Sequence, residues 1–220
     1  MTSSGRELLK WLAVILMTGD HAAKLLYGGY VPVVSELGRL AFPIFALVMA
    51  YNLAQPGADV AKSVKRLFVW GVIAQPVYVW AFGALLPVNI LLSFALAAAC
   101  VLCAQNRRWW LLVILAGPLP LFVDYQWSGV VLVLTWWWAY KLRYESRVGL
   151  VDLDALELRG WTAVCAFIPL CLYNGNAWAL LALPVMQLSN FDMQVPRSRW
   201  AFYGYYIGHL VVLAAVASFA

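Results

Sequence analysis

The chain has 220 residues, of which 65% are hydrophobic and 11% charged, and its formal net charge is +5. Soluble globular domains contain about 25% charged and about 45–50% apolar residues, so this composition excludes an ordinary water-soluble domain. The twelve tryptophans and eleven tyrosines suit the headgroup layer of a bilayer, where amphipathic aromatic rings are enriched. We therefore predict an all-α, polytopic protein surrounded by membrane lipids, and we expect no nucleic acid partner.

Apolar stretches recur along the whole chain, and a membrane-spanning helix needs about 20 such residues. The connections between them are short and contain Gly, Pro, Asn or charged residues, so no linker separates two domains. We expect a single transmembrane domain, 1–220, of about nine helices. The predicted helices are 8–27, 33–54, 63–83, 87–105, 108–123, 126–142, 158–174, 176–190 and 200–219.

Basic residues indicate the orientation of these helices. All Lys and Arg residues except Lys24 and Arg39 lie near the N-terminus or near the connections that follow the second, fourth, sixth and eighth predicted helices. If the chain crosses the membrane at each helix, these basic residues share one side. The positive-inside rule then predicts that the N-terminus lies in the cytoplasm and the C-terminus on the opposite side.

The first predicted helix contains "ILMTGDHAAKLL", with Asp20, His21 and Lys24 in an apolar run. An ionisable group within a bilayer costs a few kcal/mol or more and normally faces a partner or water. Asp20 and Lys24 are spaced i,i+4, so they can form an ion pair on one helix face. Asp20 can instead pair with Arg39 or tune His21, and a purely structural ion pair is the simplest alternative.

Lys10 and His21 are separated by about three helical turns, or about 16 Å along the axis, and lie on nearly the same face. A ligand with an anionic head in the cytosol and a long thin arm would span this distance. Acetyl-coenzyme A has this shape. Basic residues bind its phosphates, and a histidine accepts a proton near neutral pH.

Further polar residues occur in or beside the later helices. Asn89 begins the fourth predicted helix, and Asp124 precedes the sixth. Tyr206 and His209 are spaced i,i+3 in the last helix, so they share a face. The four cysteines include one CxxC spacing without a second pair, so we expect no metal site.

The segments "KWLAVILMTGDH", "LGRLAFPIFALVMAYNL", "GVIAQ", "NILLSFALA", "VDYQWSGVVLV" and "FYGYYIGHL" occur in this order along the chain. Together they resemble the TraX family of conjugative-plasmid membrane proteins. The resemblance implies N-terminal acetylation of a conjugative pilin subunit in the bacterial inner membrane. In that membrane, the orientation predicted from Lys and Arg puts the C-terminus in the periplasm. The resemblance also implies a relation to membrane acyltransferases that use a basic residue, ten intervening residues and a histidine, a pattern that Lys10 and His21 fit.

The resemblance predicts an acetyl-CoA-dependent N-acetyltransferase in which His21 is the general base, assisted by Asp20. The expected residues for coenzyme phosphates are Lys10, Lys65 and Arg66. The expected contacts to substrate or oxyanion are Arg39, Asn89, Asp124, Tyr206 and His209. Transfer can be direct or pass through an acetyl-histidine. The alternatives are an O-acetyltransferase acting on a glycan or lipid, a non-catalytic pilin-handling factor and a proton-coupled transporter.

Overall fold

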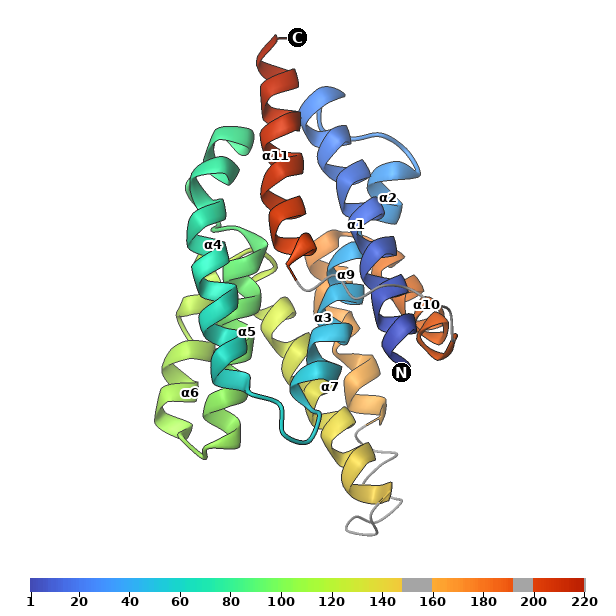
Figure 1. Ribbon diagram of the computed structural model, residues 1–220, viewed down its shortest axis with the longest axis vertical. Helices are drawn as coiled ribbons and strands as arrows, with labels where there is room; N and C mark the ends of the chain where they lie inside the picture. The colour runs from blue at the N-terminus through green and yellow to red at the C-terminus, as the bar shows by residue number, and fades with distance from the viewer. Residues whose placement is uncertain (148–159, 192–199, 220) are drawn as a thin grey trace. The chain divides into compact units, whose positions relative to one another are not determined.

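The computed structural model describes residues 1–147, 160–191 and 200–219 (Figure 1). Over these ranges the regular structure is helical, apart from one isolated bridge between Val88 and Val123. The predicted all-α class is therefore confirmed. The first two residues of the predicted helix 158–174 lie outside the described residues.

The chain forms two compact units. Unit 1 comprises Met1–Val48, Ile73–Leu85 and Asn176–Ala220, and unit 2 comprises Met49–Val72 and Leu86–Gly175. The two units alternate along the sequence, so neither is a continuous segment that a linker could release. The expectation of one domain, 1–220, stays a prediction.

Unit 1 is organised by α1 (Ser3–Leu26), which packs against α2 (Val34–Gly38), α11 (Ala201–Phe219) and the 3-10 helix η3 (Met186–Asn190). Thr2 caps α1, because its hydroxyl accepts a hydrogen bond from the Gly5 backbone N–H. A Cβ on Gly5 would lie 2.3 Å from the Ser189 carbonyl oxygen. Glycine at this position therefore permits the close packing of α1 on η3.

The predicted helix 33–54 is divided into α2 and α3 (Ala41–Leu53) by Arg39 and Leu40. Pro43 explains the interruption. Its ring would clash with the carbonyl of residue 39 in a continuous helix, but proline is tolerated within the first turn of a new one. The predicted helix 176–190 is likewise replaced by three short elements. These are η2 (Trp178–Leu181), α10 (Ala182–Val185) and η3.

Unit 2 is built around α5 (Ile90–Gln105), which packs against α6 (Trp109–Ala116) and α7 (Gln126–Arg147). The 3-10 helix η1 (Leu119–Phe122) and α9 (Phe167–Asn174) pack against α7. Alanines 95, 97 and 98 of α5 are almost completely buried. Their small side chains allow the neighbouring helices to approach closely.

The helix α4 (Val60–Phe82) contributes its first part to unit 2 and its last part to unit 1. It continues through Pro76. Pro76 has no N–H to donate, so one hydrogen bond of the helical ladder is missing there.

Two stretches of the described residues, Val34–Leu53 and Ala201–Phe219, are long and apolar enough to cross a membrane. Shorter apolar helices occupy Ile90–Gln105, Trp109–Phe122 and Gly160–Asn174. The helices α1 and α4 have 24 and 23 residues, but both contain several charged side chains. The structure thus gives a helical protein with two candidate membrane-spanning stretches, and the predicted topology of about nine spanning helices is not confirmed.

Candidate functional site

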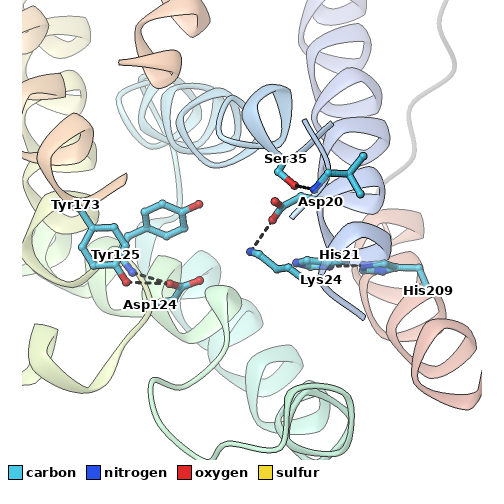
Figure 2. Close-up of polar contacts among 9 residues, drawn as sticks. Asp20, His21, Lys24, Ser35, Asp124, Tyr125, Tyr173 and His209 are labelled. Carbon is cyan, nitrogen blue, oxygen red and sulfur yellow. Dashed lines mark hydrogen bonds and ion pairs between the residues drawn. The ribbon is translucent and has the colours of Figure 1, made fainter. Parts of the chain in front are cut away.

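Unit 1 brings together the two histidines of the chain. His21 on α1 and His209 on α11 are joined by a hydrogen bond of 2.8 Å between His21 Nδ1 and His209 Nε2 (Figure 2). Their rings are nearly parallel, with an interplanar angle of 6° and centroids 5.1 Å apart. His209 is buried and His21 is half-buried. The predicted site residues of the first and last helices are therefore direct partners.

Aromatic rings hold this histidine pair on both sides. Tyr205 stacks on His209 with centroids 5.3 Å apart, and Phe82 of α4 meets the His21 ring at 71°. The Thr18 hydroxyl donates to the Val14 carbonyl, so the Tyr205 hydroxyl donates to Thr18 Oγ1 at 2.9 Å. These contacts limit rotation of both imidazoles.

Asp20 and Lys24 form the ion pair that their spacing predicts. Lys24 Nζ lies 2.6 Å from Asp20 Oδ2 (Figure 2). Asp20 is 8% exposed, yet its Oδ1 has no hydrogen-bond partner in the part of the chain that the structure describes. A Cβ on Gly38 would lie 2.5 Å from Asp20 Cβ, so glycine at 38 makes room for the carboxylate. Asp20 thus presents one unused, buried acceptor oxygen.

Lys10 lies toward the other end of α1. Its ammonium forms an ion pair with Glu7 and lies over the Phe202 ring, 4.8 Å from the centroid. The side chain is 21% exposed. Lys10 therefore already has an anionic partner, and its predicted contact with coenzyme phosphate stays a prediction.

Arg39 ends α2, where its backbone N–H donates to the Glu36 carbonyl. Glu36 in turn accepts a hydrogen bond from the Tyr30 hydroxyl at 2.8 Å, and this bond raises the pKa of Tyr30. The Arg39 guanidinium is half-buried and forms no ion pair with the described residues. Arg39 is thus a cation of unit 1 with no carboxylate of the described ranges at ion-pair distance.

The other predicted residues of unit 1 and unit 2 have different surroundings. Tyr206 is buried, and its ring packs against His209 with centroids 5.7 Å apart. Lys65 and Arg66 lie on the first part of α4, in unit 2, and are exposed. Unit 1 therefore collects Asp20, His21, Arg39, Tyr206 and His209, and the basic residues of α4 belong to unit 2.

Asn89, also in unit 2, is completely buried. Its Oδ1 accepts from the Leu91 backbone N–H at 3.0 Å as the N-cap of α5, and its Nδ2 donates to the Gly71 carbonyl at 2.8 Å. Both ends of the side-chain amide are engaged within unit 2. These contacts give Asn89 a structural role.

Asp124 lies between η1 and α7 in unit 2. Its Oδ1 accepts from the Tyr125 backbone N–H at 2.9 Å, and the Tyr173 hydroxyl lies 3.5 Å from the same oxygen (Figure 2). Tyr125 has a positive φ of 60°, which the bond to the preceding carboxylate helps to hold. Asp124 thus organises the turn before α7.

Three residues of the site were absent from the predicted set: Thr18, Phe82 and Tyr205. Tyr205 precedes His209 by four residues, so helical spacing alone places the two on one face. Phe82 and Thr18 carry no comparable signal, because their roles depend on how α4 and α11 pack on α1. Among the described residues, no group of three or more His, Cys, Asp or Glu side chains is placed to hold a metal ion.

The family model described as TraX protein matches residues 5–217. Protein TraX of Escherichia coli is 32% identical over 225 residues, covering 96% of this chain and 87% of that protein. Protein TraX of Escherichia coli (strain K12) is 34% identical over 224 residues, with the same coverage. An uncharacterized protein of Rickettsia prowazekii (strain Madrid E) is 34% identical over 101 residues, covering 46% of this chain and 38% of its own length. No solved structure matches the chain. The chain belongs to the TraX family.

Proposed function

We propose that the protein is an acetyltransferase that moves an acetyl group from cytosolic acetyl-CoA to the N-terminal amine of a membrane-inserted conjugative pilin subunit. The observation that carries the proposal is the hydrogen-bonded pair of His21 and His209. His21 uses Nδ1 in this pair, and its Nε2 makes no hydrogen bond with the described residues. A half-buried imidazole with one free nitrogen suits a general base.

From the neutral amine, the reaction replaces a C–S bond by a C–N bond and moves one proton from the amine to the leaving thiolate. The amine nitrogen attacks the thioester carbonyl, so a C–N bond forms, and the C–S bond breaks as the tetrahedral intermediate collapses. His21 Nε2 accepts the amine proton and passes it to the leaving thiolate, which gives free coenzyme A. General-base assistance of this type contributes about 10²–10⁴-fold to the rate.

Asp20 supplies an anionic acceptor for the substrate amine. Its Oδ1 is buried without a hydrogen-bond partner, and such an oxygen costs about 1–3 kcal/mol or more. A protonated N-terminus could donate to this oxygen while Lys24 remains on Oδ2. We propose that Asp20 binds the acceptor as its ammonium, which releases one proton to solvent, and that His21 removes the second proton as the neutral amine attacks.

The oxyanion needs hydrogen-bond donors, which usually supply the largest catalytic effect in acyl transfer. Asn89 Nδ2 donates to the Gly71 carbonyl, and His209 Nε2 is engaged in the pair with His21. Arg39 and Tyr206 are the remaining predicted donors of unit 1, and we propose Arg39 first because it forms no ion pair with the described residues.

We place the protein in the bacterial inner membrane as a multi-pass protein. The two candidate spans and three shorter apolar helices support this location, as does the distribution of Lys and Arg. Coenzyme phosphates would meet the basic residues of the cytoplasmic side, among them Lys10, Lys65 and Arg66. Lys10 is expected to contribute less than a free cation because Glu7 already neutralises it.

The test is to measure the intact mass of pilin produced with wild-type protein, with His21→Ala and with Ile15→Ala. Ile15 lies on the same helix and is 66% exposed, so its substitution controls for expression and insertion. His21→Ala should abolish acetylation, and Ile15→Ala should not. Normal acetylation of pilin with His21→Ala would contradict the proposal.

The acceptor is tested with purified protein, acetyl-CoA and either a pilin N-terminal peptide or a glycan. Transfer to the peptide supports the proposal, and transfer only to the glycan indicates an O-acetyltransferase. A thermal-shift titration with acetyl-CoA separates both from a non-catalytic pilin-handling factor, for which we expect no stabilisation by the coenzyme.

A further inference from the structure

A chain of two hydrogen bonds connects His21 to the backbone of α11. His209 Nδ1 lies 2.9 Å from the Tyr205 carbonyl oxygen. His209 Nε2 lies 2.8 Å from His21 Nδ1 (Figure 2). A carbonyl oxygen can only accept a hydrogen bond. His209 Nδ1 must therefore carry a proton for the first of these bonds to form.

The position of that proton determines the rest of the chain. A neutral imidazole with a proton on Nδ1 has a lone pair on Nε2. His209 Nε2 thus accepts, and His21 Nδ1–H donates. Every other combination of neutral tautomers breaks at least one of the two bonds, by placing two lone pairs or two protons face to face.

We infer that His209 is a positioning residue that holds His21 in the Nδ1–H tautomer and leaves His21 Nε2 as the basic nitrogen. The catalytic consequence rests on the proposed function, whereas the tautomer itself does not. A histidine without a partner favours the opposite tautomer in water, with the proton on Nε2. His209 would therefore reverse the preference of the free side chain.

The packing around the pair strengthens this effect. His209 is only 8% exposed, so water cannot easily replace a broken bond to either of its nitrogens. A buried polar group without a partner costs about 1–3 kcal/mol. The Tyr205 ring, which stacks on His209, also keeps His209 Nε2 directed at His21.

In this tautomer the basic lone pair of His21 is on Nε2, which faces away from His209 and is therefore available to the substrate. When His21 Nε2 accepts a proton from the amine, His21 Nδ1–H continues to donate to His209 Nε2. The role parallels that of the aspartate in Ser-His-Asp enzymes, where placing histidine in the wrong tautomer lowers kcat about 10⁴-fold. His209 would fix the tautomer of His21 with a neutral ring, where those enzymes use a carboxylate.

Nitrogen-15 NMR measures the tautomer directly, without any substrate. The chain contains two histidines, so ¹⁵N-histidine labelling of the full-length protein in lipid nanodiscs gives signals from these two residues alone. At pH 8 both rings are expected to be neutral with protonated Nδ1 and unprotonated Nε2. A wild-type His21 signal with its proton on Nε2 would overturn the inference.

Two substitutions of His209 distinguish the effect of its Nε2 acceptor from the effect of its aromatic ring. His209→Phe keeps an aromatic ring for stacking but has no acceptor, and His209→Gln places its Oε1 near the position of Nε2 but has no ring. His21 is then the remaining histidine and its signals need no assignment. We expect the Nε2–H tautomer with Phe and the Nδ1–H tautomer with Gln. Equal tautomers in the two variants would contradict the role of His209.

Acetylation of a pilin peptide provides the second readout. His209→Phe should lower kcat about 10²–10⁴-fold with little change in KM, and His209→Gln should restore most of the rate. Loss of rate to the same extent in both variants would also count against the inference. If the wild-type protein transfers no acetyl group, the proposed function fails, but the NMR result still decides the tautomer.

Discussion

The predicted site residues of the two units differ in how completely their hydrogen bonds are satisfied. In unit 2, both ends of the Asn89 amide are engaged by backbone groups, and Asp124 Oδ1 accepts from Tyr125. In unit 1, Asp20 Oδ1 is buried without a partner among the described residues, and His21 Nε2 likewise makes no hydrogen bond with them.

This difference separates structural from functional polarity more clearly than burial does. Asn89 is more deeply buried than either His21 or Asp20. Its bonds, however, are completed by the fold, so its removal should cost stability. Among the predicted site residues, groups whose hydrogen bonds the fold leaves incomplete can bind a ligand, so their removal should cost activity. The following substitutions test that distinction.

Asp20→Asn should have the largest effect of the four substitutions that follow. Loss of a charge-assisted bond to the substrate amine costs about 1.5–3 kcal/mol, so acetylation should fall roughly 10- to 150-fold. Stability should change by less than about 1 kcal/mol, because Lys24 is partly exposed and readily solvated. Acetylation kinetics and thermal unfolding of the same preparation measure both effects. A large loss of stability that accounts for the lost activity would place Asp20 with the structural residues.

Asn89→Ala should give the opposite result. It removes the α5 cap and the bond to Gly71, which together contribute about 2 kcal/mol. We expect a lower unfolding temperature and an unchanged kcat for the folded fraction. Asn89→Asp is the matched control, because it retains the capping oxygen and loses only the donor to Gly71. A selective loss of kcat in Asn89→Ala would return Asn89 to the set of oxyanion donors.

Spacing along the sequence predicted those features of the site that lie within a single helix. The i,i+4 spacing of Asp20 and Lys24 predicted their ion pair, and mid-helix placement marked His21 and His209. The direct bond between the histidines could not be predicted, since the residues are 188 positions apart and many helix packings are compatible with one sequence. The hydrogen bond from Asn89 Nδ2 to the Gly71 carbonyl could not be predicted for the same reason.

Apolar composition predicted helices but not their interruptions. The stretch 33–54 is apolar enough to be predicted as one span, and the structure divides it at Arg39 and Leu40, four and three residues before Pro43, where proline disfavours a continuous helix. The stretch 176–190 forms short 3-10 and α elements instead of one helix. Hydropathy measures how well a segment tolerates lipid, and it does not report whether the backbone remains regular.

Lys10→Ala tests whether an engaged residue of unit 1 can still act on a ligand. Lys10 is shared between Glu7 and the Phe202 ring, so we expect it to contribute only about 1 kcal/mol to coenzyme binding. This corresponds to a roughly fivefold increase in KM for acetyl-CoA with kcat unchanged. Lys10→Arg should keep the wild-type KM. An unchanged KM in Lys10→Ala would remove Lys10 from the proposed coenzyme site.

Tyr205→Phe should have the smallest effect and should separate two functions of one residue. The substitution removes the hydroxyl that donates to Thr18 but keeps the ring on His209 and the carbonyl that accepts from it. A single neutral hydrogen bond contributes about 0.5–1.5 kcal/mol to stability. We therefore expect a small decrease in unfolding temperature and a change in kcat of less than about threefold. If kcat falls as far as in His209→Phe, the hydroxyl itself positions the histidine pair, and the bond between α11 and α1 becomes part of the site.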